Sequence, residues 1–120
     1  MPFSFYGHQQ LGRTIGAQEV TLLTYSIPKN TSIRFQIDVL GRDIDTYAGI
    51  VIRELGGAKR QNGNASLIGT PRTVFAPIVD PAMGLAAVKV NVSGVDVVIS
   101  VTGIINKTID WFGQIELVTQ

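Results

Sequence analysis

Few residues of this chain have side chains that could carry out chemistry, and those few lie far apart. The chain has a single histidine, His8, and no cysteine, so a thiol nucleophile, a disulfide and a thiolate metal site are excluded within it. We interpret His8, beside Gln9 and Gln10, as a surface or interface residue, because a general base must lie within reach of a reacting group. A histidine metal site or a hydrolytic site would have to be shared between subunits. We therefore predict no catalytic residue, no metal and no cofactor, and we expect that the protein is not an enzyme.

Two carboxylates, Asp43 and Asp45, lie in a segment typical of a turn between strands. Their oxygens could contribute to a Ca²⁺ site, but the glycine and the later glutamate of a calcium loop are missing. Arg42 is adjacent and can neutralise the charge, so we interpret the pair as ordinary turn capping. Asp110 and Glu116 are expected on the outward face of the last strand, exposed to solvent rather than paired.

Trp111 admits two interpretations, because an exposed tryptophan on a sheet can stack on a sugar ring. Alternation places it with Ile109 and Ile115 on the apolar side of its strand, which favours a core tryptophan. Phe112 has the opposite parity and is the better candidate for a contact outside the domain. The glycines at 56 and 57 precede Lys59 and Arg60 without the spacing of a phosphate-binding loop, and we expect a loop or hairpin end there.

The elements that must position these residues show the alternation of β-strands. Residues 32–41 are the clearest case, with apolar residues at every odd position from Ile33 to Val39 and polar residues between them. Shorter or less regular strand patterns occupy residues 19–28, 47–55, 65–69 and 88–117, and no helical period with caps appears. We predict an all-β fold, a single antiparallel β-sandwich of about seven to eight strands with jelly-roll or Ig-like connectivity.

Residues 88–117 resemble three consecutive antiparallel strands whose sequence specifies their faces. A two-residue turn at Ser93 and Gly94 would pair Val92 with Val95 and Val88 with Ile99, which puts the valines on one face. If the pairing register shifted by one residue, apolar side chains of one strand would lie beside polar side chains of the other. The hairpin turns with primed geometry favour Asn or Asp before Gly, so a bulge is an alternative here.

Residues 1–17 have neither a helical nor a strand period, yet they are rich in ring-bearing side chains, namely Phe3, Phe5, Tyr6 and His8. We predict an extended N-terminal arm over residues 1–17, followed by the sandwich domain over residues 18–120. Apolar side chains in a terminal segment need a surface to bury against. The arm is therefore expected either to cover its own sandwich or to reach onto a neighbouring subunit.

Residues 70–84 form the least regular segment, with prolines at 71, 77 and 81 that argue against a central strand and a long helix. A connection of about 15 residues is long for a compact domain and is often functional. We expect this apolar loop to pack on something outside the sandwich. The predicted intersubunit contacts are Phe3, Phe5, Tyr6, His8, Phe75, Met83 and Phe112.

Composition limits the partners. The chain has 120 residues, enough for one domain, and its 10 basic and 9 acidic residues are scattered without a basic cluster, which disfavours nucleic-acid binding. No apolar run is long enough for a membrane span, and the first residues lack the features of a secretory signal. Charged residues make up only 16% of the chain, which favours a surface covered by another subunit over the alternative, a valine-rich monomer of ordinary solubility. We therefore expect a homo-oligomer, with no nucleic-acid or membrane partner.

The order of short motifs along residues 18–118 resembles a β-sandwich domain that recurs in virion proteins of tailed bacteriophages, notably tail-fibre and spike proteins. The motifs are Ile-Pro-Lys-Asn-Thr-Ser at 27–32, Val-Leu-Gly-Arg at 39–42, Tyr-Ala-Gly at 47–49, Leu-Ile-Gly at 67–69, Val-Ser-Gly-Val at 92–95, Val-Thr-Gly at 101–103 and Thr-Ile-Asp-Trp at 108–111. The sequence departs from fibre proteins in that the domain fills nearly the whole chain and the loop over 70–84 is apolar.

The resemblance implies a virion structural or attachment module with no carried-over catalytic residue, found in the virion and assembled in the bacterial cytoplasm. The first hypothesis is a capsid decoration or cement protein, trimeric, which would bind the major capsid protein or another virion protein through its arm and loops. The alternative is a tail-fibre or tail-tip adhesin that binds a host receptor or carbohydrate, with Phe112 or Tyr47 as exposed aromatic contacts.

Overall fold

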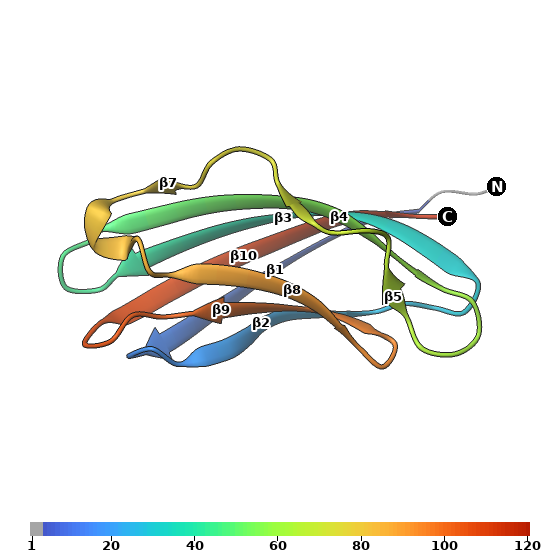
Figure 1. Ribbon diagram of the computed structural model, residues 1–120, viewed down its shortest axis with the longest axis horizontal. Coiled ribbons are helices and arrows are strands. Elements are labelled where there is room, and N and C mark those ends of the chain that lie inside the picture. The colour runs from blue at the N-terminus through green and yellow to red at the C-terminus, as the bar shows by residue number, and fades with distance from the viewer. Residues whose placement is uncertain (1–3) are drawn as a thin grey trace.

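The computed structural model describes the backbone of residues 4–120 and the side chains of residues 7–120, and it is a sandwich of two antiparallel sheets (Figure 1). The predicted all-β antiparallel sandwich is confirmed. The larger sheet has the order β1 (Ser4–Ile15), β10 (Thr108–Thr119), β3 (Thr31–Asp43) and β4 (Gly49–Arg60), and three short strands pair with β4, namely β5 (Ser66–Leu67), β6 (Arg72–Thr73) and β7 (Ile78–Val79). The smaller sheet has the order β2 (Glu19–Ser26), β9 (Asp96–Thr102) and β8 (Ala87–Ser93).

The core lies between the two sheets and follows from the alternation of the long strands. In β3 the odd-numbered residues from Ile33 to Val39 are buried, while their even-numbered neighbours face solvent. In β10 Trp111 is 1% exposed, which confirms the predicted core tryptophan, and its indole Nε1–H donates to the buried Thr14 hydroxyl at 2.9 Å. Burial of such large side chains is the main favourable term in folding, and the Thr14 hydroxyl satisfies the polar atom of the ring.

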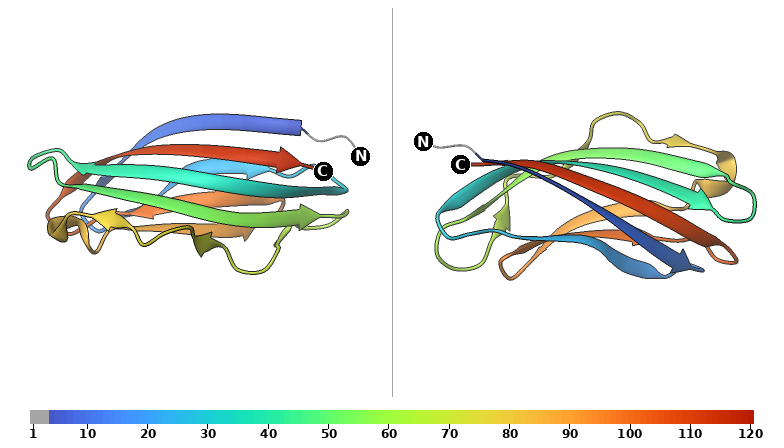
Figure 2. Two further views of the ribbon diagram at one scale, coloured as in Figure 1. Left: turned by 90° about the horizontal axis from the view of Figure 1, so that it is seen from above. Right: turned by 180° about the vertical axis from the view of Figure 1, so that it is seen from behind.

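The segment predicted as an extended arm is an edge strand of the larger sheet. Residues 4–15 pair with β10 along their whole length, from Ser4 opposite Thr119 to Ile15 opposite Thr108. Figure 2 shows β1 at one margin of this sheet, beside β10. The sequence left open whether this segment packs on its own sandwich or on a neighbouring subunit. Residues 4–15 belong to their own sandwich, because pairing with β10 satisfies their main-chain groups on one side.

The hairpin of β8 and β9 has the predicted faces but not the predicted register. Val90 pairs with Ile99 and Val92 with Val97, so the turn is formed by Gly94 and Val95. Gly94 has a φ of 60°, the conformation that a type II′ turn requires at its first central position and that glycine adopts without strain. The register differs from the prediction by two residues, which leaves every side chain on its predicted face.

The third predicted strand of this region does not continue the hairpin. After β9 the chain crosses to the other sheet, where β10 is inserted between β1 and β3. The three strands are therefore not a meander within one sheet (Figure 1). Ile109, Trp111 and Ile115 still face the core, because the core lies between the sheets and can be reached from either one.

The connection over residues 70–84 runs along the outer margin of β4 and ends in a single turn of 3₁₀ helix, η1 (Pro81–Met83). Met83 is 0% exposed and belongs to the core, so its prediction as an intersubunit contact is wrong. A loop has no periodic pattern from which the direction of an apolar side chain could be inferred. Here the 3₁₀ turn directs the Met83 side chain into the core. None of the helical segments in residues 4–120 has the length and apolar character needed to cross a bilayer.

Candidate functional site

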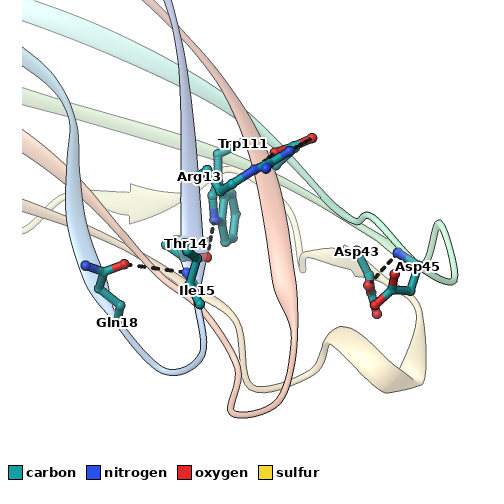
Figure 3. A network of polar contacts seen from close by, with 8 residues as sticks. Arg13, Thr14, Ile15, Gln18, Asp43, Asp45 and Trp111 are labelled. Atoms are coloured by element: carbon teal, nitrogen blue, oxygen red, sulfur yellow. Dashed lines mark hydrogen bonds and ion pairs between the residues drawn. The ribbon is translucent and has the colours of Figure 1, made fainter.

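The Asp43 carboxylate is buried at the start of the β3–β4 connection, where it organises the turn. One of its oxygens accepts a hydrogen bond from the Asp45 main-chain N–H at 3.0 Å (Figure 3). The other accepts from the Thr46 hydroxyl at 3.0 Å and forms an ion pair with Lys107 Nζ at 3.1 Å. The predicted turn capping is thus confirmed, although the neutralising cation is Lys107 and not Arg42. Arg42 instead lies over the ring of Tyr47, with its guanidinium carbon 4.8 Å from the ring centre.

These contacts favour the charged form of Asp43. The hydrogen bond from the Asp45 N–H and then the one from Lys107 lower the pKa of Asp43 below its ordinary value of 3.8, against the opposing effect of burial. A lowered pKa in the folded state means that Asp43 stabilises the fold above about pH 4 and that this contribution is lost as the pH falls through the folded pKa. The carboxylate is committed to the turn, so a Ca²⁺ site is not needed to explain it.

We expect Asp43→Asn to lower the Tm at pH 7 by roughly 5 °C and to flatten the acid dependence of stability, because the amide cannot keep the ion pair with Lys107. Asp45→Asn is the matched control, since it removes the same charge from an exposed side chain two residues away and keeps the main-chain donor. The measurement is thermal unfolding followed by circular dichroism from pH 7 to pH 3. Equal effects of the two substitutions would contradict this role of Asp43.

Asp110 and Arg13 form a bidentate pair across β10 and β1, with Arg13 Nε 2.7 Å and Nη2 3.2 Å from the two carboxylate oxygens. Asp110 faces outward as predicted, but it is paired and not simply solvated. The hydrogen bond from Arg13 lowers the pKa of the Asp110 carboxyl. Among residues 7–120, no group of three or more histidine and acidic side chains could hold a metal ion.

The predicted contact residues are spread over separate elements. Phe3 lies outside the described residues, and the structure places Phe5 and Tyr6 only by their backbone in β1, opposite Val118 and Leu117. Whether these residues contact another subunit stays a prediction.

Three further contact candidates lie on the outside of the larger sheet or at its margin. His8 is exposed in β1. Phe75 is 38% exposed, and its ring centre is 6.0 Å from the guanidinium carbon of Arg53. Phe112 lies on the outer face of β10, in agreement with its predicted parity.

A row of apolar side chains crosses the outer face of the larger sheet from β1 to β7, and we call it the outer apolar row. Its members are neighbours in the pairing register, in the order Leu11, Phe112, Leu40, Val51 and Ile78. Its two ends are the most exposed, with Leu11 at 73% and Ile78 at 64%. Contiguous exposed apolar residues are typical of an interaction surface.

A polar cleft with a volume of about 470 Å³ lies at the opposite end of β3 and β4 from the Asp43 turn. It is lined by Asn30, Thr31, Ser32, Lys59, Arg60, Gln61, Asn64 and Ser66. The pairing register places the Lys59 residue directly between Ser32 of β3 and Ser66 of β5. An ammonium group between two hydroxyl-bearing residues is suited to an anionic ligand that also carries hydroxyl groups.

The walls of the cleft are fixed by hydrogen bonds. The Asn30 N–H donates to the Gln61 carbonyl at 2.7 Å, which joins the β2–β3 turn to the end of β4. Arg60 donates from Nε to the Gly63 carbonyl at 2.9 Å and from Nη1 to the Ile27 carbonyl at 3.0 Å. The residues that line the cleft have two basic side chains and no carboxylate side chain, so these side chains favour negative charge in a ligand.

Sequence reasoning missed both surfaces. The cleft joins a turn near residue 30 to the end of β4 near residue 60, and only the pairing of β3 with β4 brings them together. The sequence predicts a loop after Gly56, whereas β4 continues to Arg60. The strand that positions Lys59 was therefore not predicted. A signal for the outer apolar row was present, since Leu40 and Val51 are apolar at positions where alternation calls for a polar residue.

No family model matches the sequence, and no curated protein matches it. Among solved structures, the chain is similar to the tailspike protein gp49 of Acinetobacter baumannii bacteriophage Fri1, a capsular polysaccharide depolymerase, with a TM-score of 0.44 and 14% identity over 95% of this chain and 17% of that one. It is also similar to the tailspike protein of Acinetobacter baumannii phage AM24, with a TM-score of 0.45 and 9% identity over 98% of this chain and 26% of that one. The chain thus spans about a sixth to a quarter of the length of these proteins.

Proposed function

We propose that this β-sandwich is a module of a bacteriophage tail fibre or tailspike that binds a negatively charged saccharide of the host surface through the polar cleft. The observation that carries the proposal is the row of Ser32, Lys59 and Ser66 in a cleft that no aspartate or glutamate lines. Lysine forms charge-assisted hydrogen bonds with a sugar carboxylate or sulfate, and the flanking hydroxyls and amides can bond to sugar hydroxyls. The order of sequence motifs supports the placement in a tail protein.

The proposal is for binding and not for hydrolysis at this cleft. Glycosidic bonds are in most families hydrolysed by a pair of carboxylic acids, one of which protonates the leaving group. The lining of the cleft offers hydroxyl, amide and basic side chains and contains no aspartate or glutamate. Its chemistry therefore fits recognition of an acidic sugar without cleavage.

Lys59→Glu is expected to weaken binding of acidic oligosaccharides at least tenfold, because it puts a carboxylate where the ligand carries its own negative charge. Lys89→Glu is the matched control, since it makes the same change in charge on an exposed residue of β8 in the other sheet. Binding is measured by titration calorimetry with uronic-acid-containing oligosaccharides, with neutral oligosaccharides as a reference.

Binding should also weaken as the salt concentration rises, since the contact involves charge. Equal affinities of the two variants, or the absence of binding to every acidic oligosaccharide tested, would contradict the proposal for the cleft.

Capsid decoration is the second candidate, and the outer apolar row is the observation that favours it. A decoration protein needs a surface that docks on the particle, and the row offers exposed apolar residues from Leu11 to Ile78. The free arm that was expected to make this contact is absent over residues 4–15, which belong to the sheet. Immunogold labelling of virions distinguishes the candidates: label at the tail supports the first proposal, and label on the head supports the second.

A further inference from the structure

The margins of the two sheets differ in how they are protected against pairing with another strand. The outer side of β4 is covered by β5, β6 and β7. In β2 a bulge between Thr21 and Leu23 interrupts the register, and β8 is a short strand that carries the exposed Lys89. Coverage, bulges and edge lysines are the devices by which proteins prevent edge-to-edge association.

The margin formed by β1 has none of these devices along most of its length. The strand has 12 residues, and β10 is its one partner among the described strands. From Ser4 to Gly12 the strand contains no lysine, arginine, acidic residue or proline. A long edge strand without charge is a template for another strand, unless a partner already covers it.

The direction of the main-chain groups of β1 follows from the hydrogen bonds at its end. The Gly16 N–H donates to the Lys107 carbonyl at 2.8 Å, so the even-numbered residues of β1 face β10 and the odd-numbered ones face outward. The Ile15 N–H agrees with this, because it points outward and donates to the Gln18 side-chain oxygen at 3.5 Å (Figure 3). Gly7 and Gln9 therefore present their main-chain N–H and C=O groups to the outside.

We propose that the open margin of β1 pairs with β1 of a second copy of this chain, as antiparallel strands related by a two-fold axis near Leu11. Such a pair is self-complementary, since an uncharged strand meets its own copy without like charges in contact. Arg13, near the end of the strand, is already paired with Asp110 of its own chain. The two larger sheets would then form one continuous sheet.

The outer apolar row supports this choice of partner and of axis. The row begins at Leu11, which is 73% exposed at the margin itself. With the axis near Leu11, each copy places this side chain beside the same residue of the other copy, so the most exposed apolar side chain among residues 7–15 of β1 gains a cross-strand neighbour. The two rows then join into one that runs across both subunits.

Gln9→Pro is the decisive variant, because residue 9 points its N–H outward. Proline at this position removes a donor from the open margin and keeps the hydrogen bonds between β1 and β10, as proline on an edge strand does. Gln9→Thr is the matched control, since it keeps the N–H. We expect the natural chain and Gln9→Thr to be dimers in sedimentation equilibrium, and Gln9→Pro to raise the dimer dissociation constant at least tenfold.

Leu11→Lys gives a second variant, in case proline disturbs the strand. It brings two ammonium groups together across the axis, and the same loss of dimer is expected. Circular dichroism and the Tm of each variant show that the monomer is still folded. A monomeric natural chain at high concentration, a trimer, or unchanged dimerisation of folded Gln9→Pro and Leu11→Lys would each overturn the proposal.

The absence of cysteine from the chain allows a direct test of the axis. A single cysteine introduced as Leu11→Cys can form a disulfide only with another molecule, and opposed residues on paired strands lie within disulfide range. Ile78→Cys, at the other end of the outer apolar row and also well exposed, is the control. Mild oxidation should give covalent dimers of Leu11→Cys and not of Ile78→Cys, and the reverse result would overturn the proposed axis.

Discussion

Replacing Trp111 by alanine is expected to lower the free energy of unfolding by about 3–5 kcal/mol, the largest loss from any single substitution that we predict. Trp111 is the largest fully buried side chain and lies against Gly41, where an added Cβ would come within 2.7 Å of its ring. Truncation removes this apolar area from the core and leaves a cavity that closely packed strands cannot fill by relaxing. Urea unfolding followed by far-ultraviolet circular dichroism measures the loss.

Thr14→Val separates the polar part of the Trp111 contribution from its packing. Valine has nearly the shape of threonine but cannot accept the indole N–H, which would be left buried without a partner. We expect a loss of about 1–3 kcal/mol from this unsatisfied donor. A loss equal to that of Trp111→Ala would show that the hydrogen bond, and not the packing of the ring, dominates at this site.

Gly103→Ala is expected to destabilise the fold by about 3 kcal/mol, although it adds a single methyl group. Gly103 lies at the corner between β9 and β10, where its N–H donates to the Gln18 carbonyl at 3.0 Å. An added Cβ would overlap the Gly16 carbonyl oxygen and would lie 2.5 Å from Thr14 Oγ1. The Gly16 oxygen is a main-chain atom, so the clash can be relieved only by moving the β1–β2 turn.

Gly63→Ala is the matched control for this substitution. A Cβ on Gly63 would meet no atom within 4 Å, so the same change of residue is expected to leave stability within about 0.5 kcal/mol of the natural chain. Differential scanning calorimetry of the two variants compares them directly. Similar losses at both positions would contradict the contact at the corner as the cause, because replacing glycine by alanine lowers the entropy of the unfolded chain and by itself favours folding.

Phe112 shows how much of the candidate surface could be predicted from the sequence. Its parity in β10 correctly placed it on the outer face, and it lies in the outer apolar row. The other members of the row come from strands far apart in the chain, so their alignment depends on the register of four strand pairs. Alternation determines the face of a residue but not its neighbours on the adjacent strand.

The sequence by itself determined the faces of the strands, the all-β fold and the burial of Trp111, because a period of two is a local property of the chain. The tertiary structure decided which strands pair. It placed β10 between β1 and β3, made residues 4–15 an edge strand, directed Met83 into the core and brought Ser32 beside Lys59 in the cleft. Strand pairing joins residues far apart in the chain, and a shift of register by two residues leaves every face unchanged. Local alternation therefore cannot predict which strands pair or in which register. The packing of the complete core and the protection of the sheet margins select the pairing.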